Sequence, residues 1–357
     1  MVDLSIIRQL PKVELHDHLD GGLRPLTVLE LADEQGVVLP AFTEKDLEAW
    51  FLRGADRKDL ALYLEGFSLT VSVLQDAKSL KRAAREAIID SSLENIIYTE
   101  IRFAPSLHTM RGLTHEEIIE AVLEGLEEGS AETGIVYGLI LCAMRDKSDS
   151  FKIAELAVAY RSKGVAGFDI AGGEHGYPSV NHLDAFNYIR SKNFNITIHA
   201  GEGFGVDSIW QAVQMCGAHR IGHATRLTED MTFTGTRITR MGTLSHFIRD
   251  RRLPLEMCLT SNIQTGAAPS LEDHPFNLFY RNRFRVFLCT DNRLVSGTTL
   301  TREMGIASSA YSLDMDDLEK ITINAMKSAF IHYEERLAII YDIIKPEFKR
   351  ISRQCGK

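Results

Sequence analysis

The sequence predicts an α/β chain that closes into a (β/α)8 barrel, with a helical lid after the first strand and extra C-terminal helices. Eight short, β-rich apolar runs alternate with segments of helical periodicity, and this alternation is typical of parallel β/α topology. Eight such units within about 280 residues favour a closed barrel over an open sheet. The length of 357 residues would also allow two domains. We expect one domain over residues 1–357, with the lid at about 40–75.

The predicted strands are short segments in which apolar and β-branched residues dominate. An open doubly wound sheet is the alternative, but the glycines of segment 201–205 lack the spacing of a dinucleotide-binding loop. The sequence also contains no phosphate-binding P-loop and no Gly-x-Ser-x-Gly elbow. The eight strands are expected at Lys12–His18, Ile96–Pro105, Val136–Arg145, Val165–Gly172, Asn195–His199, Arg220–His223, Leu253–Ser261 and Arg285–Asp291.

Helical periodicity fills most of the gaps between these strands. Segment Ser79–Glu94 places apolar residues at every third or fourth position, which predicts an amphipathic helix. Thr114 and Glu117 have the spacing of a capping box, and the helix that they start should end before Gly134. Further helices are expected at Ser150–Lys163, Ser179–Lys192, Asp207–Cys216, Thr243–Arg251 and, beyond the last strand, within Ser312–Lys349. Met231–Gly242 is interpreted as a surface insertion after the sixth strand.

Composition and charge exclude several classes of protein. A net charge of −9 without a long basic run argues against binding to nucleic acid. No run of about 18 apolar residues predicts a membrane span, and the first residues lack the apolar region of a signal peptide. The 5 cysteines contain no Cys-x-x-Cys pair, so neither a disulfide framework nor a thiolate zinc site is expected. This pattern fits a reducing cytoplasm.

Titratable residues gather where several predicted strands end, and in a parallel barrel those ends form the rim that carries the active site. His16 and His18 are two positions apart on one strand, so their side chains face the same side. In a barrel that side is the interior, where the two imidazoles could share a metal ion. Because the motif is short, a hydrogen-bonded pair of histidines without a metal is the alternative.

Two more residues would reach the same rim, namely His199 from the fifth strand and Asp291 from the eighth. Three imidazoles and one carboxylate suit zinc, with a position open for water whose pKa falls to about 7. His223 could accept a proton from this water or steer it, unless it is only a core histidine. Glu202 would act as a general acid in an apolar mouth, the alternative being an exposed loop acid. No lysine follows the fourth strand to bridge a second ion, so the sequence predicts one Zn²⁺ per chain.

Seven short segments also occur in the order and with the spacing of a known family. The chain resembles the adenosine deaminases, which are zinc amidohydrolase barrels, and the likeness covers nearly its whole length. The segments are His16–Gly22, Ile170–Gly172, His199–Glu202, Gly222–Ala224, Ser261–Asn262, Thr290–Asn292 and Asn324–Phe330. Taken together, they are highly specific.

The resemblance implies a role for each residue of the rim. Glu202 would protonate the purine at N1, and His223 would orient the zinc-bound water and help to deprotonate it. Gly172 would donate its backbone amide to N3, and Asp20 would accept a hydrogen bond from ribose. The zinc ligands would be His16, His18, His199 and Asp291.

The predicted lid carries Leu60, Tyr63, Leu64 and Phe67 at helical spacing. In the light of the resemblance, they form either an apolar gate over the substrate or a helix that is simply packed on the barrel. Tyr63 and Phe67 are therefore candidate substrate-binding residues.

The resemblance also implies a substrate. Plain adenine deaminases tend to carry Glu where this chain has the shorter Asp20, so a nucleoside is favoured. The expected reaction is hydrolysis of adenosine, and of 2′-deoxyadenosine, to the inosine form and ammonia.

Asn292 departs from the family, which usually has Asp at this position as a protonated donor to purine N7. The amide of Asn is a donor at any pH, so recognition of N7 can survive. The change leaves adenine or 6-aminodeoxyfutalosine open as alternative substrates. Hydrolysis of a cyclic amide, or a non-catalytic nucleoside-binding or signalling role, are the rival functions.

Overall fold

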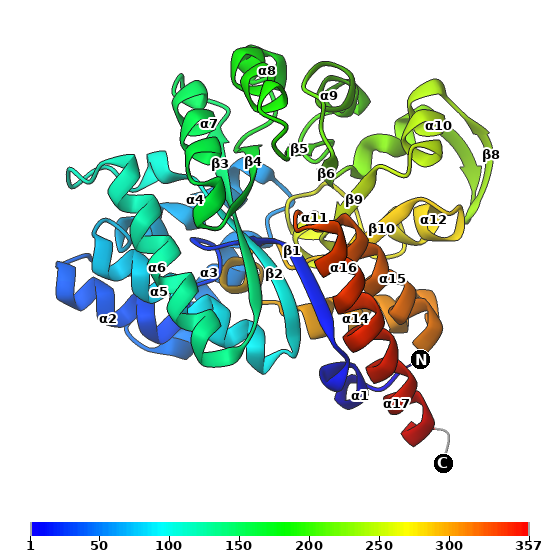
Figure 1. The fold of residues 1–357 in the computed structure, drawn as a ribbon, viewed down its shortest axis with the longest axis horizontal. Helices are drawn as coiled ribbons and strands as arrows, with labels where there is room; N and C mark the ends of the chain where they lie inside the picture. The colour runs from blue at the N-terminus through cyan, green and yellow to red at the C-terminus, as the bar shows by residue number, and fades with distance from the viewer. Residues whose placement is uncertain (1, 356–357) are drawn as a thin grey trace.

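The computed structural model describes residues 2–355 and confirms the predicted barrel (Figure 1). Two four-stranded parallel sheets make up the barrel wall. Bridges between Asp17 and Asp291 and between Phe168 and Ile196 close the two seams. The first sheet contains β1 (Lys12–His18), β2 (Ile96–Phe103), β3 (Val136–Met144) and β4 (Val165–Ala171). The second contains β5 (Thr197–Ala200), β6 (Arg220–His223), β9 (Pro254–Met257) and β10 (Arg285–Leu288).

Helices surround these strands, and the segment between β1 and β2 holds four of them (Figure 1). They are α2 (Pro25–Gln35), α3 (Glu44–Ala55), α4 (Leu60–Ser72) and α5 (Ala77–Leu93). The next helices along the chain are α6 (His115–Thr133), α7 (Ser150–Ala159), α8 (Leu183–Ser191), α9 (Val206–Trp210), α10 (Thr243–Asp250), α11 (Leu259–Gln264) and α12 (Phe276–Arg281). After β10 come α13 (Arg293–Ser296), α14 (Leu300–Tyr311), α15 (Met315–Ser328), α16 (Tyr333–Ala338) and α17 (Lys345–Cys355), while α1 (Leu4–Gln9) precedes β1.

Some predicted boundaries need correction. The strand expected to reach Pro105 ends at Phe103, because Pro105 starts a 3-10 turn. The strand predicted to reach Ser261 ends at Met257, since α11 begins at Leu259. The predicted insertion Met231–Gly242 forms an antiparallel hairpin of β7 (Met231–Thr234) and β8 (Arg237–Met241).

The predicted helix ends were partly wrong as well. Helix α7 stops at Ala159, and the rest of the expected segment is a 3-10 turn before Gly164. Helix α9 continues as a π-helix from Gln211. The capping box at Thr114 is confirmed, and Gly134 ends α6 in the left-handed conformation with a φ of 78°.

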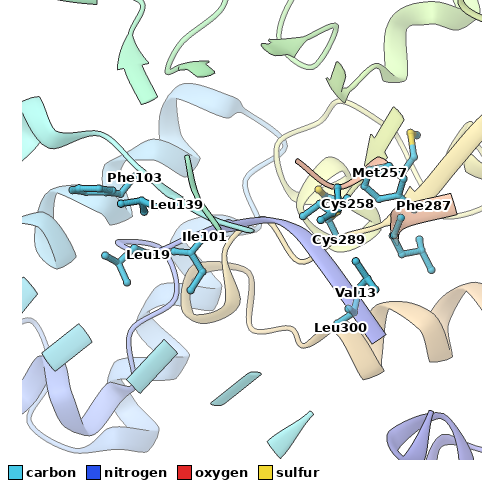
Figure 2. Close-up of a cluster of buried hydrophobic side chains, with 14 of the residues drawn as sticks. Val13, Leu19, Ile101, Phe103, Leu139, Met257, Cys258, Phe287, Cys289 and Leu300 are labelled. Atoms are coloured by element: carbon cyan, nitrogen blue, oxygen red, sulfur yellow. The ribbon is translucent and has the colours of Figure 1, made fainter. Parts of the chain in front are cut away.

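One connected cluster of buried apolar side chains runs from the N-terminal helix to α17. Figure 2 shows part of it, with Val13 of β1, Ile101 of β2, Leu139 of β3 and Phe287 of β10 among the labelled side chains. Within the described residues, no helix combines the length and the apolar character that a bilayer span requires.

Helices α5 and α6 approach closely because α6 carries glycine at the contact. A Cβ atom at Gly125 would lie 2.1 Å from the carbonyl oxygen of Lys81, and one at Gly129 would lie 2.7 Å from Cβ of Ile88. Any side chain at these positions would push the two helices apart.

We expect Gly125→Ala to lower the free energy of unfolding by about 1–3 kcal/mol, the usual cost of an overpacked core. The control is Gly54→Ala on α3, where the nearest atom to the new Cβ is 3.9 Å away. Alanine is the better helix former by roughly 0.5–1 kcal/mol, so this variant should be as stable as the parent or more stable. Thermal unfolding of both variants measures the difference, and equal melting temperatures would contradict this account of the α5–α6 contact.

Candidate active site

A cavity of about 410 Å³ contains nearly all of the residues expected at the rim. The ends of the strands contribute its floor, and α4 contributes Leu60, Tyr63, Leu64 and Phe67. The site residues predicted from the sequence that line it are His18, Asp20, Gly172, His199, Glu202, His223, Asp291 and Asn292. His16 is not among the lining residues; its side chain is fully buried beside them.

Three imidazole rings converge at the rim. Nε2 of His199 lies 3.1 Å from Nε2 of His16 and 3.1 Å from Nε2 of His18. The Oδ1 atom of Asp291 lies 3.3 Å from the first of these two nitrogens and 3.5 Å from the second. The residues predicted to bind a metal therefore present their ligand atoms to one another.

Carboxylates fix the far side of two of these rings. Nδ1 of His16 lies 2.7 Å from Glu256, and Nδ1 of His199 lies 3.0 Å from Asp169. With a proton on each Nδ1, the Nε2 lone pairs of the two neutral rings face each other at 3.1 Å. Lone pairs this close repel unless a proton or a metal ion lies between them, so the donor set fits a metal ion.

The charge balance around His16 favours a cation in the same place. Burial would lower the pKa of His16, but the carboxylates of Asp291 and Glu256 outweigh burial and raise it to about 9. The other oxygen of Asp291 accepts a hydrogen bond of 2.5 Å from Ser261, which orients the carboxylate.

The two orienting carboxylates share one arginine inside the barrel. Arg102 of β2 lies 2.8 Å from Asp169 and 2.9 Å from Glu256, and all three side chains are fully buried. Glu256 also receives Arg220 at 2.7 Å. Burial alone would raise the pKa of Glu256, but the two guanidinium groups hold it well below its usual value.

Two residues of the rim have unusual backbone conformations. His223 and Asp291 have φ values of 65° and 64°, in the left-handed region that non-glycine residues rarely occupy. Such conformations cost about 1–3 kcal/mol and cluster at functional sites. They turn these two side chains toward the cavity at the ends of β6 and β10.

Glu202 lines the same cavity as three histidines of the rim. Its carboxyl oxygen is 3.5 Å from Nε2 of His223. Burial, with the nearby charges of Asp291 and Glu174, raises the pKa of Glu202 to about 8. The group is therefore protonated at neutral pH, as a general acid must be.

Glu174 organises the turn that carries Glu202. Its carboxylate accepts hydrogen bonds of 2.7 to 3.0 Å from four consecutive backbone amides, those of residues 201–204. It also accepts a hydrogen bond from the hydroxyl group of Ser208. The turn after β5 is thus wrapped around one buried carboxylate.

The lid contacts the end of the eighth barrel strand. The amide of Asn292 donates to the hydroxyl group of Tyr63 at 2.8 Å, and this hydroxyl group lies 2.7 Å from Ser296. Burial raises the pKa of Asp20 to about 7, and one of its oxygens has no hydrogen-bond partner. Gly172 has a φ of 97°, which a residue with a side chain would adopt only under strain.

The carboxylate partners of the site residues are not apparent from the sequence. Glu256 sits in an apolar strand, so a lone acid in a predicted barrel strand was the available signal. Asp169 lies on β4, and nothing in the sequence indicates its contact with His199. Glu174 directly follows the Gly172-Gly173 pair but gives no sequence signal of its own.

A closed parallel barrel with convergent imidazoles and a carboxylate at its rim defines the class of protein as a barrel hydrolase of the amidohydrolase type. A solved amidohydrolase from Burkholderia ambifaria with bound Zn supports the fold, with a TM-score of 0.86 at 20% identity, over 99% of this chain and 94% of that chain. The solved Arabidopsis ADAL complexed with IMP has a TM-score of 0.81 at 29% identity, over 98% of each chain.

The sequence comparisons define the family. The family model described as adenosine deaminase matches residues 11–346. Adenosine deaminase from Mycobacteroides abscessus is 50% identical over 353 residues, which is 97% of this chain and 98% of that protein. The chain therefore belongs to the adenosine deaminase family.

We expect Asp169→Asn to weaken the binding of Zn²⁺ by about 10- to 100-fold, because the amide cannot hold the Nδ1 proton of His199 as a carboxylate does. Asp230→Asn is the control, since Asp230 binds the backbone amide of Ser245 instead of a rim histidine. Titration of each metal-free variant with Zn²⁺ measures the affinity. Equal affinities for the two variants would show that this carboxylate does not support the metal site.

Proposed function

We propose that the chain is an adenosine deaminase, which hydrolyses adenosine and 2′-deoxyadenosine to inosine and 2′-deoxyinosine with release of ammonia. The observation that carries this proposal is the meeting of three imidazole Nε2 atoms and a carboxylate beside the buried carboxyl group of Glu202. Relatives such as the enzyme from Mycobacteroides abscessus, named adenosine deaminase, support it.

We assign one Zn²⁺ per chain to His16, His18, His199 and Asp291. A set with His223 in place of His18 has all of its ligand atoms within 4.8 Å of one another and is the alternative. We favour His18, whose Nε2 faces His199 and Asp291, because Nε2 of His223 faces the carboxyl group of Glu202. Bound Zn²⁺ would lower the pKa of a water molecule to about 7 and make hydroxide available at neutral pH.

The residues beside the proposed metal site would protonate the purine and orient the attacking oxygen. Glu202 donates its proton to purine N1, which draws electrons from C6 and opens this carbon to attack. His223 holds the attacking oxygen in place through Nε2, the ring nitrogen that faces Glu202. The hydroxyl proton of the added oxygen then passes to the amino group, and the C6–N bond breaks to release ammonia as C6 becomes a carbonyl. The cavity shields the reaction from bulk water.

Five residues would bind the substrate without taking part in bond breaking. The backbone amide of Gly172 donates to N3, and the free amide proton of Asn292 donates to N7, since its other proton is shared with Tyr63. Asp20 accepts a hydrogen bond from the ribose. Tyr63 and Phe67 cover the base from α4.

The charges of the cavity favour a nucleoside over a nucleotide. Four carboxyl groups line it, those of Asp20, Asp146, Glu202 and Asp291, and no lysine or arginine of the described chain does. A phosphate group would therefore find no cationic partner there. The lining suits a neutral purine nucleoside.

We further propose that residues 1–357 form one domain, with the lid made of α3 and α4. The large apolar cluster that runs from α1 to α17 supports this proposal. We place the protein in the cytoplasm, because Cys142, Cys216, Cys258 and Cys289 are free and buried, as is usual in reducing compartments. Neither nucleic acid nor a membrane is a proposed partner.

A panel of 6-aminopurines tests the proposed substrate. We expect adenosine and 2′-deoxyadenosine to give higher kcat/KM values than adenine or AMP. Asp20→Ala should reduce kcat/KM for the nucleosides about tenfold, the loss of roughly 1.4 kcal/mol of binding, and leave adenine unchanged. A preparation that binds Zn²⁺ but deaminates no nucleoside would refute the function, and an equal loss for adenine would refute the role of Asp20.

Glu202→Gln should retain Zn²⁺ and lose about 10²- to 10⁴-fold in kcat, because the amide cannot supply a proton to N1. In the parent enzyme, the raised pKa of Glu202 keeps the acid protonated up to about pH 8. Activity should therefore fall as the pH rises above about 8. The control is Glu229→Gln, an exposed glutamate that pairs with Arg226. Normal turnover by Glu202→Gln would mean that N1 is protonated by another group.

A further inference from the structure

A chain of hydrogen bonds runs from the loop before α12 to His223. The backbone N–H of Phe276 donates to Nδ1 of His274 at 3.1 Å. Nε2 of His274 lies 3.1 Å from Oδ1 of Asn262, and Nδ2 of Asn262 lies 2.9 Å from Nδ1 of His223. None of these residues except His223 lines the cavity.

The first bond sets the direction of all the others. A backbone N–H can only donate, so Nδ1 of His274 must be an acceptor without a proton. A neutral imidazole carries its proton on the other nitrogen, and Nε2 of His274 therefore donates to Asn262. That contact identifies the oxygen of Asn262, so its amide nitrogen must point at His223.

The side-chain amide of Asn262 passes this donor-to-acceptor order on to His223 in the active site. Because the NH2 group of Asn262 donates to Nδ1 of His223, this nitrogen bears a lone pair. We propose that His274 and Asn262 are positioning residues that hold neutral His223 with its proton on Nε2, so that His223 donates a hydrogen bond into the active site. The relay, defined as Phe276 N–H, His274, Asn262 and His223, thus selects one of two tautomers.

Burial makes the selection strong. His274 is 2% exposed and Asn262 is fully buried, so a reversed amide would leave two facing donors or two facing acceptors without water to satisfy them. Burial lowers the pKa of His274 to about 3, which keeps this ring neutral at any working pH. On the cavity side, Nε2 of His223 faces a carboxyl oxygen of Glu202 at 3.5 Å.

The relay also explains why His223 differs from His16 and His199. His16 and His199 direct Nδ1 to carboxylates, which leaves the lone pair of Nε2 toward the metal site. His223 has the opposite arrangement, because an amide donor replaces the carboxylate. A nitrogen that carries a proton cannot bind a metal, so the relay removes His223 from the ligand set although it lies within reach.

This inference rests on the proposed function for its catalytic meaning. A neutral His223 with a proton on Nε2 steers the attacking oxygen by donating to it, and it does not take a proton from that oxygen. Donors aimed at the developing negative charge are worth about 10²- to 10³-fold in kcat.

Nitrogen-15 NMR of the full-length chain with labelled histidine tests the tautomer directly. The two ring nitrogens have separate chemical shifts depending on which one carries the proton. We expect Nδ1 of His223 to be unprotonated and Nε2 to be protonated, with and without added Zn²⁺. A proton on Nδ1 in the parent protein would overturn the proposal whether or not the enzyme deaminates adenosine.

Three variants change the relay at two positions. Asn262→Asp has nearly the same shape but can only accept, so it should move the proton of His223 to Nδ1 and lower kcat by about 10²-fold, with little change in KM. His274→Leu frees the amide of Asn262 and should give mixed tautomers with an intermediate kcat. His274→Gln restores a donor to Oδ1 of Asn262 and should recover most of the loss.

His108→Leu is the matched control, since His108 is another fully buried histidine, bound through Nδ1 to the carbonyl group of Leu74. It reports the cost of removing a buried imidazole away from the relay, and we expect it to leave the His223 signals unchanged. Unaltered His223 signals in Asn262→Asp, or a loss in His274→Gln equal to that in His274→Leu, would refute the relay. Failure of the parent enzyme to deaminate adenosine would refute the proposed function and leave the tautomer measurement to stand.

Discussion

The site depends on the guanidinium group of Arg102, which lies between Glu256 and Asp169 inside the barrel. Each of these carboxylates binds a different rim histidine, so one buried cation connects the two rings. Buried charges are tolerated only when they are paired and hydrogen-bonded, and the removal of one partner leaves another uncompensated. Strands β1, β2, β4, β5 and β9 must therefore all be in register before this network can form. The position of the metal site is a consequence of barrel closure rather than of any one loop.

Much of the barrel could be predicted from the sequence, because each strand is a local apolar segment and each helix has its own periodicity and ends. The rim histidines could be predicted too, since strand ends share one face of a parallel barrel. The contact of His199 with Asp169 could not, because it depends on the stagger of β5 against β4 across the seam between the two sheets. The hairpin β7–β8 was missed for a different reason, because its strands have only 4 and 5 residues and are mostly exposed, so no buried apolar run marks them.

The contacts of Asn292 explain why asparagine can replace the aspartate that the family usually has at this position. Its amide nitrogen is close enough to donate to Tyr63, a residue of the lid, and Tyr63 in turn contacts Ser296. A protonated aspartic acid has a single hydroxyl proton to offer, whereas the amide offers two. Asn292 can therefore hold the lid and the substrate at the same time. The family resemblance and the departure from it are compatible because the second donor is available.

The carboxylate of Glu174 sets a limit on how this enzyme can change. Four successive backbone amides and a hydroxyl group donate hydrogen bonds to this carboxylate, so the turn after β5 is already ordered before any substrate arrives. An insertion there would separate amides that must stay consecutive, and a larger residue at Gly201 would meet Ile209 at 2.5 Å. Substitutions that fit the site to bulkier purines must therefore occur in the lid or in the loop after β4. The turn after β5 keeps its length.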